Sequence, residues 1–494
     1  MQALSRRSGK IPLALMISAV IGLGGVTACT SSADSVSAAG APAEQSASPS
    51  AAASTASTSA TTAASDPASP TPAGDLQVGA AKVDITPTGA QLPERYTEAL
   101  DPLFARSIAV RSGDQTALMI TVDAGGVSAE VWTQVTDRLQ ADLGVAPENV
   151  MLGATHSHSA GRANQDGYVD GIVRSASDAV AAVQPARMGF GTGTSYLNVN
   201  RNIIDEKTGT WWEGPNKDGL SDKTVSVVSF ETLDGQPIAV HYNYAMHAVT
   251  NGVQDRISAD YPGAASTYIE DSLGGDTVAL FSSGAAGDQN PLFFNQTYEL
   301  REIRTQDYAE RGEDISNALP PGGEGLDRND PRTALLLDQQ VQLSRSMGQL
   351  LGEEVLAVDR DIEIWGVDGQ ISGQQTTVTC PGRTRTDEGR AGQPGTYEDG
   401  EDVTIRLSLL RVGDLYLPGV DGEVFNEIGQ RLIQESPYKH TVLSTLTNGR
   451  ANSGYIYNDE AAGFTTFEVL SSRLKPGCAE NSIVDGLLGL IETA

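Results

Sequence analysis

The chain has 494 residues, with 33 lysine and arginine residues against 63 aspartate and glutamate residues, and its formal net charge is −30 at pH 7. This acidic excess excludes nucleic acid as a general partner, because phosphate neutralisation needs clustered basic side chains. Hydrophobic residues make up 39% of the chain, enough to bury a large core, so the chain is not disordered throughout.

Residues 1–28 are expected to be an export signal. Three basic residues near the start precede an uncharged apolar run from Ile11 to Ala28. The run ends in Val26-Thr27-Ala28-Cys29, which resembles the lipobox of bacterial lipoproteins, where the cysteine becomes the acylated N-terminus. We therefore expect a lipid anchor at Cys29 on the outer face of the bacterial cytoplasmic membrane. A plain transmembrane anchor is the alternative.

Residues 29–75 are expected to be a flexible tether between the membrane and the folded domain. Small and polar residues dominate this segment, and no aromatic residue precedes Tyr96. A segment with so few large apolar side chains cannot offset the entropy lost on ordering. Residues 76–494 have no obvious second linker and are expected to form one domain.

Residues 76–494 predict an α/β domain with a mixed β-sheet core and flanking helices. Strands are predicted in apolar runs rich in β-branched residues, namely Ile108–Val110, Ala117–Val122, Val150–Ala154, Val225–Phe230, Ile238–Tyr244, Thr277–Phe281 and Thr404–Leu409. Helices are predicted at Glu130–Leu143, Asp170–Val183, Pro262–Leu273, Leu335–Val358 and Glu423–Glu435.

Two segments of this domain have a distinct pattern. Thr224–Tyr244, which is split by Leu233-Asp234-Gly235, predicts an antiparallel hairpin, so the sheet should be mixed. Pro291–Thr333 is polar and rich in glycine and proline, so it is expected to be a long irregular insertion, either a candidate lid or a passive surface insertion. Cys380 and Cys478 remain after Cys29 is acylated, and in an exported protein they form either a disulfide or two buried thiols.

Two of the five histidines, His156 and His158, directly follow the predicted strand Val150–Ala154. In an extended chain, residues two apart point to the same side, so both imidazoles can face one cavity. Zinc could coordinate one or both rings, and hydrogen-bonded structural histidines are the equal alternative.

Two further segments carry candidate chemistry. His247 ends the predicted strand that runs through Asn243 to Met246. Ser283–Pro291 follows another strand and is rich in small residues, so its backbone N–H groups could face an anion or an oxyanion. A tight turn without a ligand is the alternative for this segment.

Taken together, the motifs resemble the neutral/alkaline (non-lysosomal) ceramidase family. The motifs that carry the resemblance are, in order, Val78–Pro87, Thr155–Ser159, Asn243–His247, Gly287–Pro291, Pro418–Phe425 and Gly454–Ile456. The resemblance extends to about Phe467 and implies the catalytic-domain fold of that family. Because only 39 residues follow Tyr455, we expect the C-terminal immunoglobulin-like domain of full ceramidases to be missing.

The resemblance implies a zinc amidohydrolase whose metal is held by two histidines, a glutamate and a tyrosine. Carried over by motif, the metal ligands are His156, His247, Glu423 and Tyr455. His158 would orient the substrate or a bound water. Glu423 is expected to open a helix, where the macrodipole favours a carboxylate.

The departures from the family concern groups that face the substrate. The resemblance places Asn290 where ceramidases have a catalytic serine, and an amide cannot act as that nucleophile. Phe467 stands where the family has a second tyrosine. Arg201 resembles the arginine near the substrate carbonyl, so Arg201 or loop N–H groups are candidates for stabilising the oxyanion. Asp288 or His158 is the candidate general base.

These residues imply a zinc-dependent hydrolase of amide bonds that is related to ceramidases without being a strict ceramidase. Its substrate is expected to be a small or lipid-like molecule of the envelope or the extracellular space. The alternatives are a catalytically inactive, lipid-anchored binding protein and a hydrolase of esters or carbohydrates on the same scaffold.

Overall fold

The computed structural model describes residues 76–494 except 94–95, 162–166, 206, 209, 316–319, 321 and 390–391. The expected export signal, Cys29 and the tether lie outside the described residues. Among the described residues, no helix is both long enough and apolar enough to cross a bilayer.

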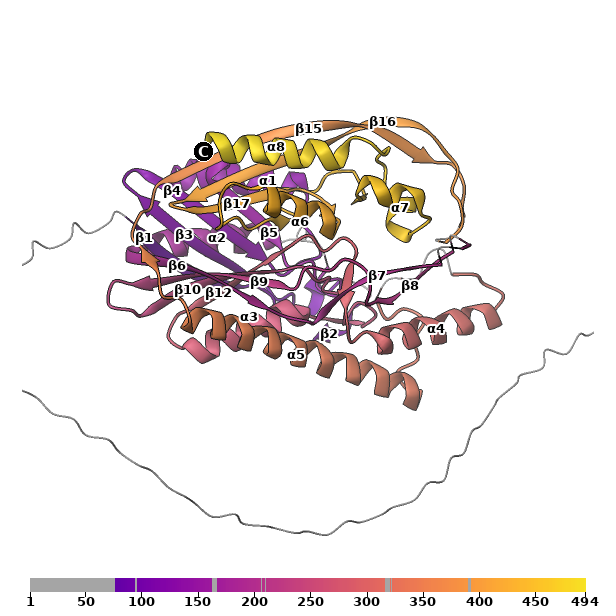
Figure 1. The fold of residues 1–494 in the computed structure, drawn as a ribbon. Helices are drawn as coiled ribbons and strands as arrows, with labels where there is room; N and C mark the ends of the chain where they lie inside the picture. The colour runs from indigo at the N-terminus through magenta and orange to yellow at the C-terminus, as the bar shows by residue number, and fades with distance from the viewer. Residues whose placement is uncertain are drawn as a thin grey trace, which may run out of the picture. The chain divides into compact units, whose positions relative to one another are not determined.

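The centre of the domain is a nine-stranded mixed sheet (Figure 1). Its strands are β1 (Gln77–Asp84), β3 (Phe104–Ser112), β4 (Gln115–Val122), β5 (Val150–Ala154), β6 (Gln184–Thr194), β9 (Thr224–Thr232), β10 (Pro237–Tyr244), β12 (Val278–Ser283) and β14 (Trp365–Gly366). The strand order is β12-β10-β9-β6-β1-β3-β4-β5, and β14 pairs with β6. At the middle of this order, β1 and β6 share two residue pairs only, Gln77 with Pro185 and Val78 with Gln184.

The two halves of this sheet stack on each other. The hydroxyl of Thr121 in β4 donates a 2.6 Å hydrogen bond to the carbonyl of Phe281 in β12. Between the halves lies an apolar core to which β3, β4, β6, β9 and β12 all contribute. The sheet therefore bends at the short β1–β6 pairing, and its two halves form a sandwich.

Two pairs of helices cover the outer faces of this sandwich. The β1-β3-β4-β5 half packs against α1 (Ala129–Leu143) and α2 (Tyr168–Ala181), and the β6-β9-β10-β12 half packs against α3 (Asp260–Leu273) and α5 (Pro331–Arg360). Ser128 caps α1 by accepting a hydrogen bond from the Val131 N–H, and Gly144 ends the helix in a left-handed conformation. The result is four layers in the order helix, sheet, sheet, helix.

Each half of the sandwich contains one parallel crossover, β4-α1-β5 and β10-α3-β12. The carboxyl ends of crossover strands are where α/β folds place their ligand sites. The segments that follow β5, β10 and β12 contain His156 and His158, His247, and the Gly287–Pro291 motif.

A second sheet lies over the inner core and carries the C-terminal helix (Figure 1). It consists of β15 (Ile371–Arg385), β16 (Tyr397–Val412), β17 (Leu415–Val420) and β19 (Ser444–Thr445). Helix α8 (Ala479–Thr493) packs along it, and a disulfide joins Cys380 of β15 to Cys478 at the start of α8. Of the two alternatives that the sequence left open, the structure thus has the disulfide.

The remaining elements are short or peripheral. They are β2 (Glu98–Ala99), β7 (Asn198–Ile204), β8 (Trp211–Asn216), β11 (Arg256–Ile257), β13 (Gln289–Pro291), β18 (Glu423–Val424), β20 (Tyr455–Ile456), α4 (Asn295–Glu310), α6 (Asn426–Glu435), α7 (Phe467–Ser471) and the 3-10 turns Gly89–Gln91, Pro147–Asn149 and Asp459–Gly463.

The expected mixed α/β architecture is confirmed, as are the hairpin β9–β10 and the five main helices. Two expectations about segments are wrong. Glu423 does not open a helix, because it lies in β18 and α6 begins at Asn426. Pro291–Thr333 is not an irregular insertion throughout, because it contains the 16-residue helix α4, which packs against α5.

Candidate metal centre

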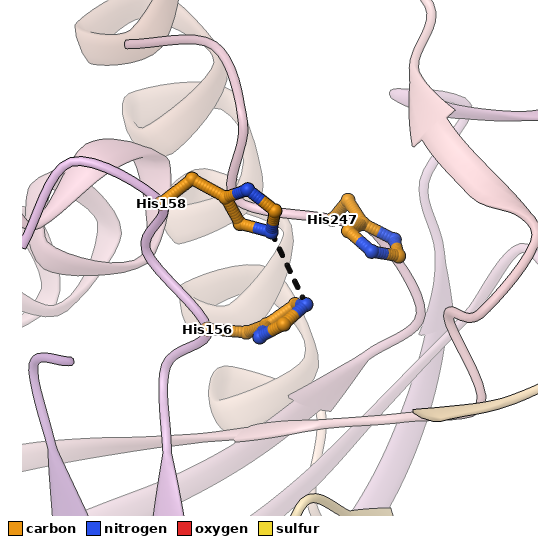
Figure 2. A group of neighbouring side chains, drawn as sticks. All are labelled: His156, His158 and His247. Carbon is orange, nitrogen blue, oxygen red and sulfur yellow. Dashed lines mark hydrogen bonds between the residues drawn. The ribbon is translucent and has the colours of Figure 1, made fainter. Parts of the chain in front are cut away.

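Three imidazoles converge where β5 and β10 end (Figure 2). His158 Nε2 lies 3.3 Å from His156 Nε2, and one ring nitrogen from each of His156, His158 and His247 lies within 4.8 Å of the others. His156 and His247 are buried, while His158 is exposed. The structure therefore brings together the three histidines that the sequence singled out.

The backbone at His156 explains this convergence and differs from the expectation. His156 has φ 61°, a left-handed conformation that is rare for a non-glycine residue, so the segment is not the extended strand from which alternation was argued. Ser157 anchors the turn by donating a 2.6 Å hydrogen bond to the Ser258 carbonyl. Backbone strain of this kind persists only where the surroundings impose it, and it concentrates at functional sites.

Backbone carbonyls fix the tautomers of the two buried rings. Nδ1 of His156 lies 2.8 Å from the Gly125 carbonyl, and Nδ1 of His247 lies 2.7 Å from the Ala286 carbonyl. A carbonyl only accepts a hydrogen bond, so each Nδ1 carries the proton and each Nε2 presents a lone pair. This arrangement is the usual preparation of a histidine for a metal.

Glu423 reaches the same point from a different part of the chain. Its Oε2 lies 3.4 Å from Nε2 of both His156 and His247, and its Oε1 accepts a hydrogen bond from Arg450. With both Nδ1 atoms protonated, no proton lies between this carboxylate oxygen and the two Nε2 lone pairs. The three electron-rich atoms repel one another unless a cation lies between them.

The donor set fits a cation such as zinc. Nε2 of His247 and Oε2 of Glu423 are buried and have no hydrogen-bond partner among the described residues. Buried polar atoms without a hydrogen-bond partner are rare, because they lower the stability of the fold. Here the two atoms face each other without hydrogen-bond geometry. Two neutral imidazoles and a carboxylate are ligands that zinc prefers, so a bound cation would satisfy all three.

Tyr455 lies at the edge of this group. Strands β18 and β20 are parallel and pair Glu423 with Tyr455, and the Tyr455 ring centroid is 6.3 Å from that of His247. Burial and the Glu423 charge raise the pKa of the phenol above its usual value. Phe467 packs edge-on against the ring at 5.8 Å, with no hydroxyl to offer a substrate.

Arg201 is buried, and each of its three guanidinium nitrogens donates a hydrogen bond within the protein. Nε donates a 2.5 Å hydrogen bond to Glu468, Nη2 a 2.8 Å bond to the Gly287 carbonyl, and Nη1 a 3.3 Å bond to Asn290. The guanidinium also lies 5.2 Å from the centroid of the Tyr455 ring. This geometry favours positioning of its neighbours over direct stabilisation of an oxyanion.

Asn290 lies in the same buried network. Its side-chain oxygen accepts from Arg201, and its Nδ2 donates a 2.8 Å hydrogen bond to Glu213, which in turn pairs with Arg301. Both ends of the amide are thus engaged with charged partners. The position that the resemblance assigns to a nucleophile is filled here by a fixed structural group.

The Asp288 loop is also held by internal bonds. The Asp288 carboxylate accepts hydrogen bonds from Asn200 at 2.8 Å and from the Asn426 N–H at 2.9 Å, and burial raises its pKa to about 6. The N–H groups of Gly287 and Gln289 donate to backbone carbonyls. These contacts favour an anchoring role over the roles of general base and oxyanion hole that the sequence suggested for this loop.

Arg450 is a site residue that sequence reasoning missed. It contacts Glu423 and lines a cavity of about 420 Å³ together with Gly126 and Gly454. The only local signal was the preceding Asn448-Gly449 turn, in which both residues have positive φ.

The fold and the site define a layered α/β protein with a buried His–Glu centre suited to a metal ion. The profile of the neutral/alkaline non-lysosomal ceramidase N-terminal domain matches residues 77–383, more than half of the chain. The chain belongs to this family, which confirms the resemblance found in the motifs. Glu423 and Tyr455 lie beyond the matched residues.

Curated relatives and solved structures agree with this assignment. The chain is 28% identical over 254 residues to neutral ceramidase A of Dictyostelium discoideum and 28% identical over 284 residues to the neutral ceramidase of Pseudomonas aeruginosa. These alignments cover 44% and 49% of the chain but only 36% and 42% of the relatives.

Among solved structures, a neutral ceramidase from Pseudomonas aeruginosa superposes with a TM-score of 0.59 at 18% identity, covering 85% of this chain and 75% of that one. A structure titled ceramidase complexed with C2 gives the same TM-score at 19% identity. These superpositions show that the fold is shared.

Proposed function

We propose that this protein is a zinc-dependent hydrolase that cleaves an amide bond in a small or lipid-like substrate. The observation that carries the proposal is the pair of unpaired buried atoms, His247 Nε2 and Glu423 Oε2, which face each other beside His156 Nε2. Membership of the ceramidase family supports hydrolysis of an N-acyl bond.

In this proposal His156, His247, Glu423 and Tyr455 hold the metal. A zinc ion bound there supplies Lewis acidity, which activates a water and polarises the scissile carbonyl. In the overall reaction, water adds to the amide carbonyl carbon, the C–N bond breaks, and a carboxylic acid and an amine leave. Arg201 keeps Tyr455 and Asn290 in place through the contacts described above.

His158 is the better candidate for general base. Its side chain is exposed, and its Nε2 lies 3.3 Å from Nε2 of His156. The Asp288 carboxylate is occupied by Asn200 and Asn426, so it has less freedom to accept a proton. An inactive His158→Ala variant that retains its metal would support the assignment, whereas full activity in both His158→Ala and Asp288→Asn would refute both candidates.

A second candidate function is that of a binding protein without turnover. The engagement of both ends of Asn290 favours it, because no nucleophilic side chain stands at that position. Such a protein would keep the metal centre and bind an acyl amide without cleaving it.

We also propose that the chain is exported and acylated at Cys29. The support is the sequence signal alone, since that segment lies outside the described residues. Mass spectrometry of the N-terminal peptide of the mature protein would test it: an acylated Cys29 supports the anchor, and an intact Met1 refutes it.

The proposed function is tested by metal content and by turnover. We expect one zinc per chain in the purified protein, lost in His247→Ala and retained in His241→Gln, a matched control because His241 is also buried but lies within β10, before the loop that contains His247. Release of amine from N-acyl substrates by the zinc-loaded protein would support hydrolysis. Bound zinc with no turnover across amides and esters would favour the binding protein, and no zinc at all would refute both.

A further inference from the structure

A cavity of about 420 Å³ adjoins the metal centre. It is lined by residues at the start of α1 and by a loop before β20, namely Gly126, Val127, Ser128, Ala129, Arg450, Ala451, Asn452 and Gly454. Gly126 follows the carbonyl partner of His156, and Gly454 precedes Tyr455. The cavity is linked to the metal centre through Arg450, whose guanidinium contacts Glu423.

Arg450 is the cationic wall of this cavity. Its side chain is 42% exposed, in contrast to the buried Arg201, each of whose three guanidinium nitrogens donates a hydrogen bond within the protein. Nη2 of Arg450 donates to Glu423, which is its hydrogen-bond partner among the described residues, and Nη1 lies over Gly126. The guanidinium therefore has further donors available on the side of the cavity.

The adjacent end of helix α1 adds backbone N–H donors, and its first turn also contains one carboxylate, that of Glu130. Helix α1 has 15 residues and begins at the cavity wall, where Ser128 caps it. The first N–H groups of a helix and its macrodipole both favour an anion. Arg450, with its remaining N–H donors, is the stronger attraction for an anion in the cavity, and the N–H groups of the helix end add to it.

We propose that this cavity binds a carboxylate on the amide substrate, so that the preferred substrates are N-acyl amino acids rather than neutral N-acyl amines. This inference rests on the proposed amide hydrolysis. The planar fork of a guanidinium matches a carboxylate, and a single arginine in a chain with a net charge of −30 suits a monoanion better than a polyanion.

The test compares two substrates that share an acyl chain and an amide bond. The zinc-loaded protein is assayed with N-octanoylglycine, which has a carboxylate, and with N-octanoylethanolamine, which does not. We expect kcat/KM to be roughly tenfold or more higher for the carboxylate, the range of a hydrogen bond to a charged group. Arg450→Gln should reduce this ratio to near one through a higher KM, and Arg450→Lys should restore part of it.

Two controls distinguish a loss of carboxylate recognition from damage to the metal site. Zinc content of Arg450→Gln reports whether the contact with Glu423 is needed for the metal site. Arg138→Gln, on the same helix α1 and with a similar 43% exposure, should keep the wild-type ratio. Equal kcat/KM for the two substrates, or an unchanged ratio in Arg450→Gln, would overturn the inference while leaving amide hydrolysis intact.

A lack of turnover would instead contradict the proposed function. If neither amide is cleaved, hydrolysis is refuted for this class, and calorimetric binding of N-octanoylglycine decides the inference alone. Binding to the wild type that is lost in Arg450→Gln would support the carboxylate site, and no binding to either protein would overturn it.

Discussion

Glu423 and Tyr455 are direct partners in the parallel ladder of β18 and β20, although 32 residues separate them in the chain. The ladder has two residue pairs, and one of them consists of two proposed metal ligands. This short pairing therefore serves to align a carboxylate and a phenol beside the two imidazoles contributed by the main sheet.

The first prediction distinguishes the proposed metal ligands from residues that only neighbour the metal centre. Glu423→Gln should lower zinc affinity by at least about 100-fold, because it removes the anionic oxygen that faces both imidazoles. His158→Ala should retain zinc, since its exposed ring is not among the four proposed ligands. Competition with a chelator of known affinity measures both. Zinc loss in His158→Ala would instead indicate a three-histidine site.

The second prediction concerns the buried ion pair of Arg201 and Glu468. Glu468 is fully buried and Arg201 nearly so, so removing one partner strands a charge. Arg201→Met should lower the free energy of unfolding by about 3–5 kcal/mol, and the double variant with Glu468→Leu should recover much of that loss. Urea unfolding measures both effects.

A matched control for this pair is the exposed pair of Arg174 and Asp178 on α2. Arg174→Met should cost no more than about 0.5 kcal/mol, because water screens an exposed pair. Equal losses at the two arginines would mean that burial does not govern the Arg201 interaction.

The third prediction concerns stability in acid. Burial lowers the pKa of His241 to about 4, while in the unfolded chain it returns to its ordinary value near 6.5. Between those values the unfolded state binds the extra proton, so His241 makes the folded protein lose up to about 3 kcal/mol as the pH falls from 6.5 to 4. Above pH 6.5 it has no such effect.

His241→Gln should remove this acid-sensitive component. Thermal melts of both proteins from pH 4 to pH 8 should show a flatter dependence in the variant below pH 6.5 and parallel curves above it. A constant offset between the two curves across the whole range would contradict the assignment to His241.

The fourth prediction concerns the disulfide between Cys380 and Cys478, whose cysteines are 98 residues apart in the sequence. The disulfide closes a long loop and so restricts the unfolded chain. Removing the disulfide should therefore lower the free energy of unfolding by about 2–4 kcal/mol. The double variant Cys380→Ala/Cys478→Ala should melt at a lower temperature than the oxidised wild type. Reductant should lower the wild-type melting temperature and leave the variant unchanged, whereas equal sensitivity of both proteins would exclude the disulfide as the cause.

Local sequence patterns were sufficient for most of the fold. The helix expected at Glu130–Leu143 is observed as Ala129–Leu143, because its apolar spacing, its serine cap and its terminal glycine all act within a few residues. The helix α4 was missed because it is polar on nearly all sides, with Leu300 as its fully buried apolar residue. Its periodicity was therefore hidden among the surrounding glycines and prolines.

The site was predictable in its members and less so in its geometry. His156, His247 and Glu423 do converge, but Glu423 reaches them through pairing with a strand 32 residues away, which leaves no local signal. The left-handed backbone of His156 is likewise imposed by tertiary contacts. Apart from the Asn448-Gly449 turn before it, Arg450 had no periodic or motif context, so its place beside Glu423 identified it.

The positions of the proposed ligands along the chain also determine the order in which they are synthesised. The imidazoles of His156 and His247 are synthesised first, while Glu423 follows His247 by 176 positions and Tyr455 comes later still. A nascent chain that has produced only the stacked sheets would display both rings without their anionic counterparts. Contacts between residues this distant in sequence form slowly. Metal acquisition should thus be a late event of biogenesis, because it must follow the synthesis of Glu423 and Tyr455.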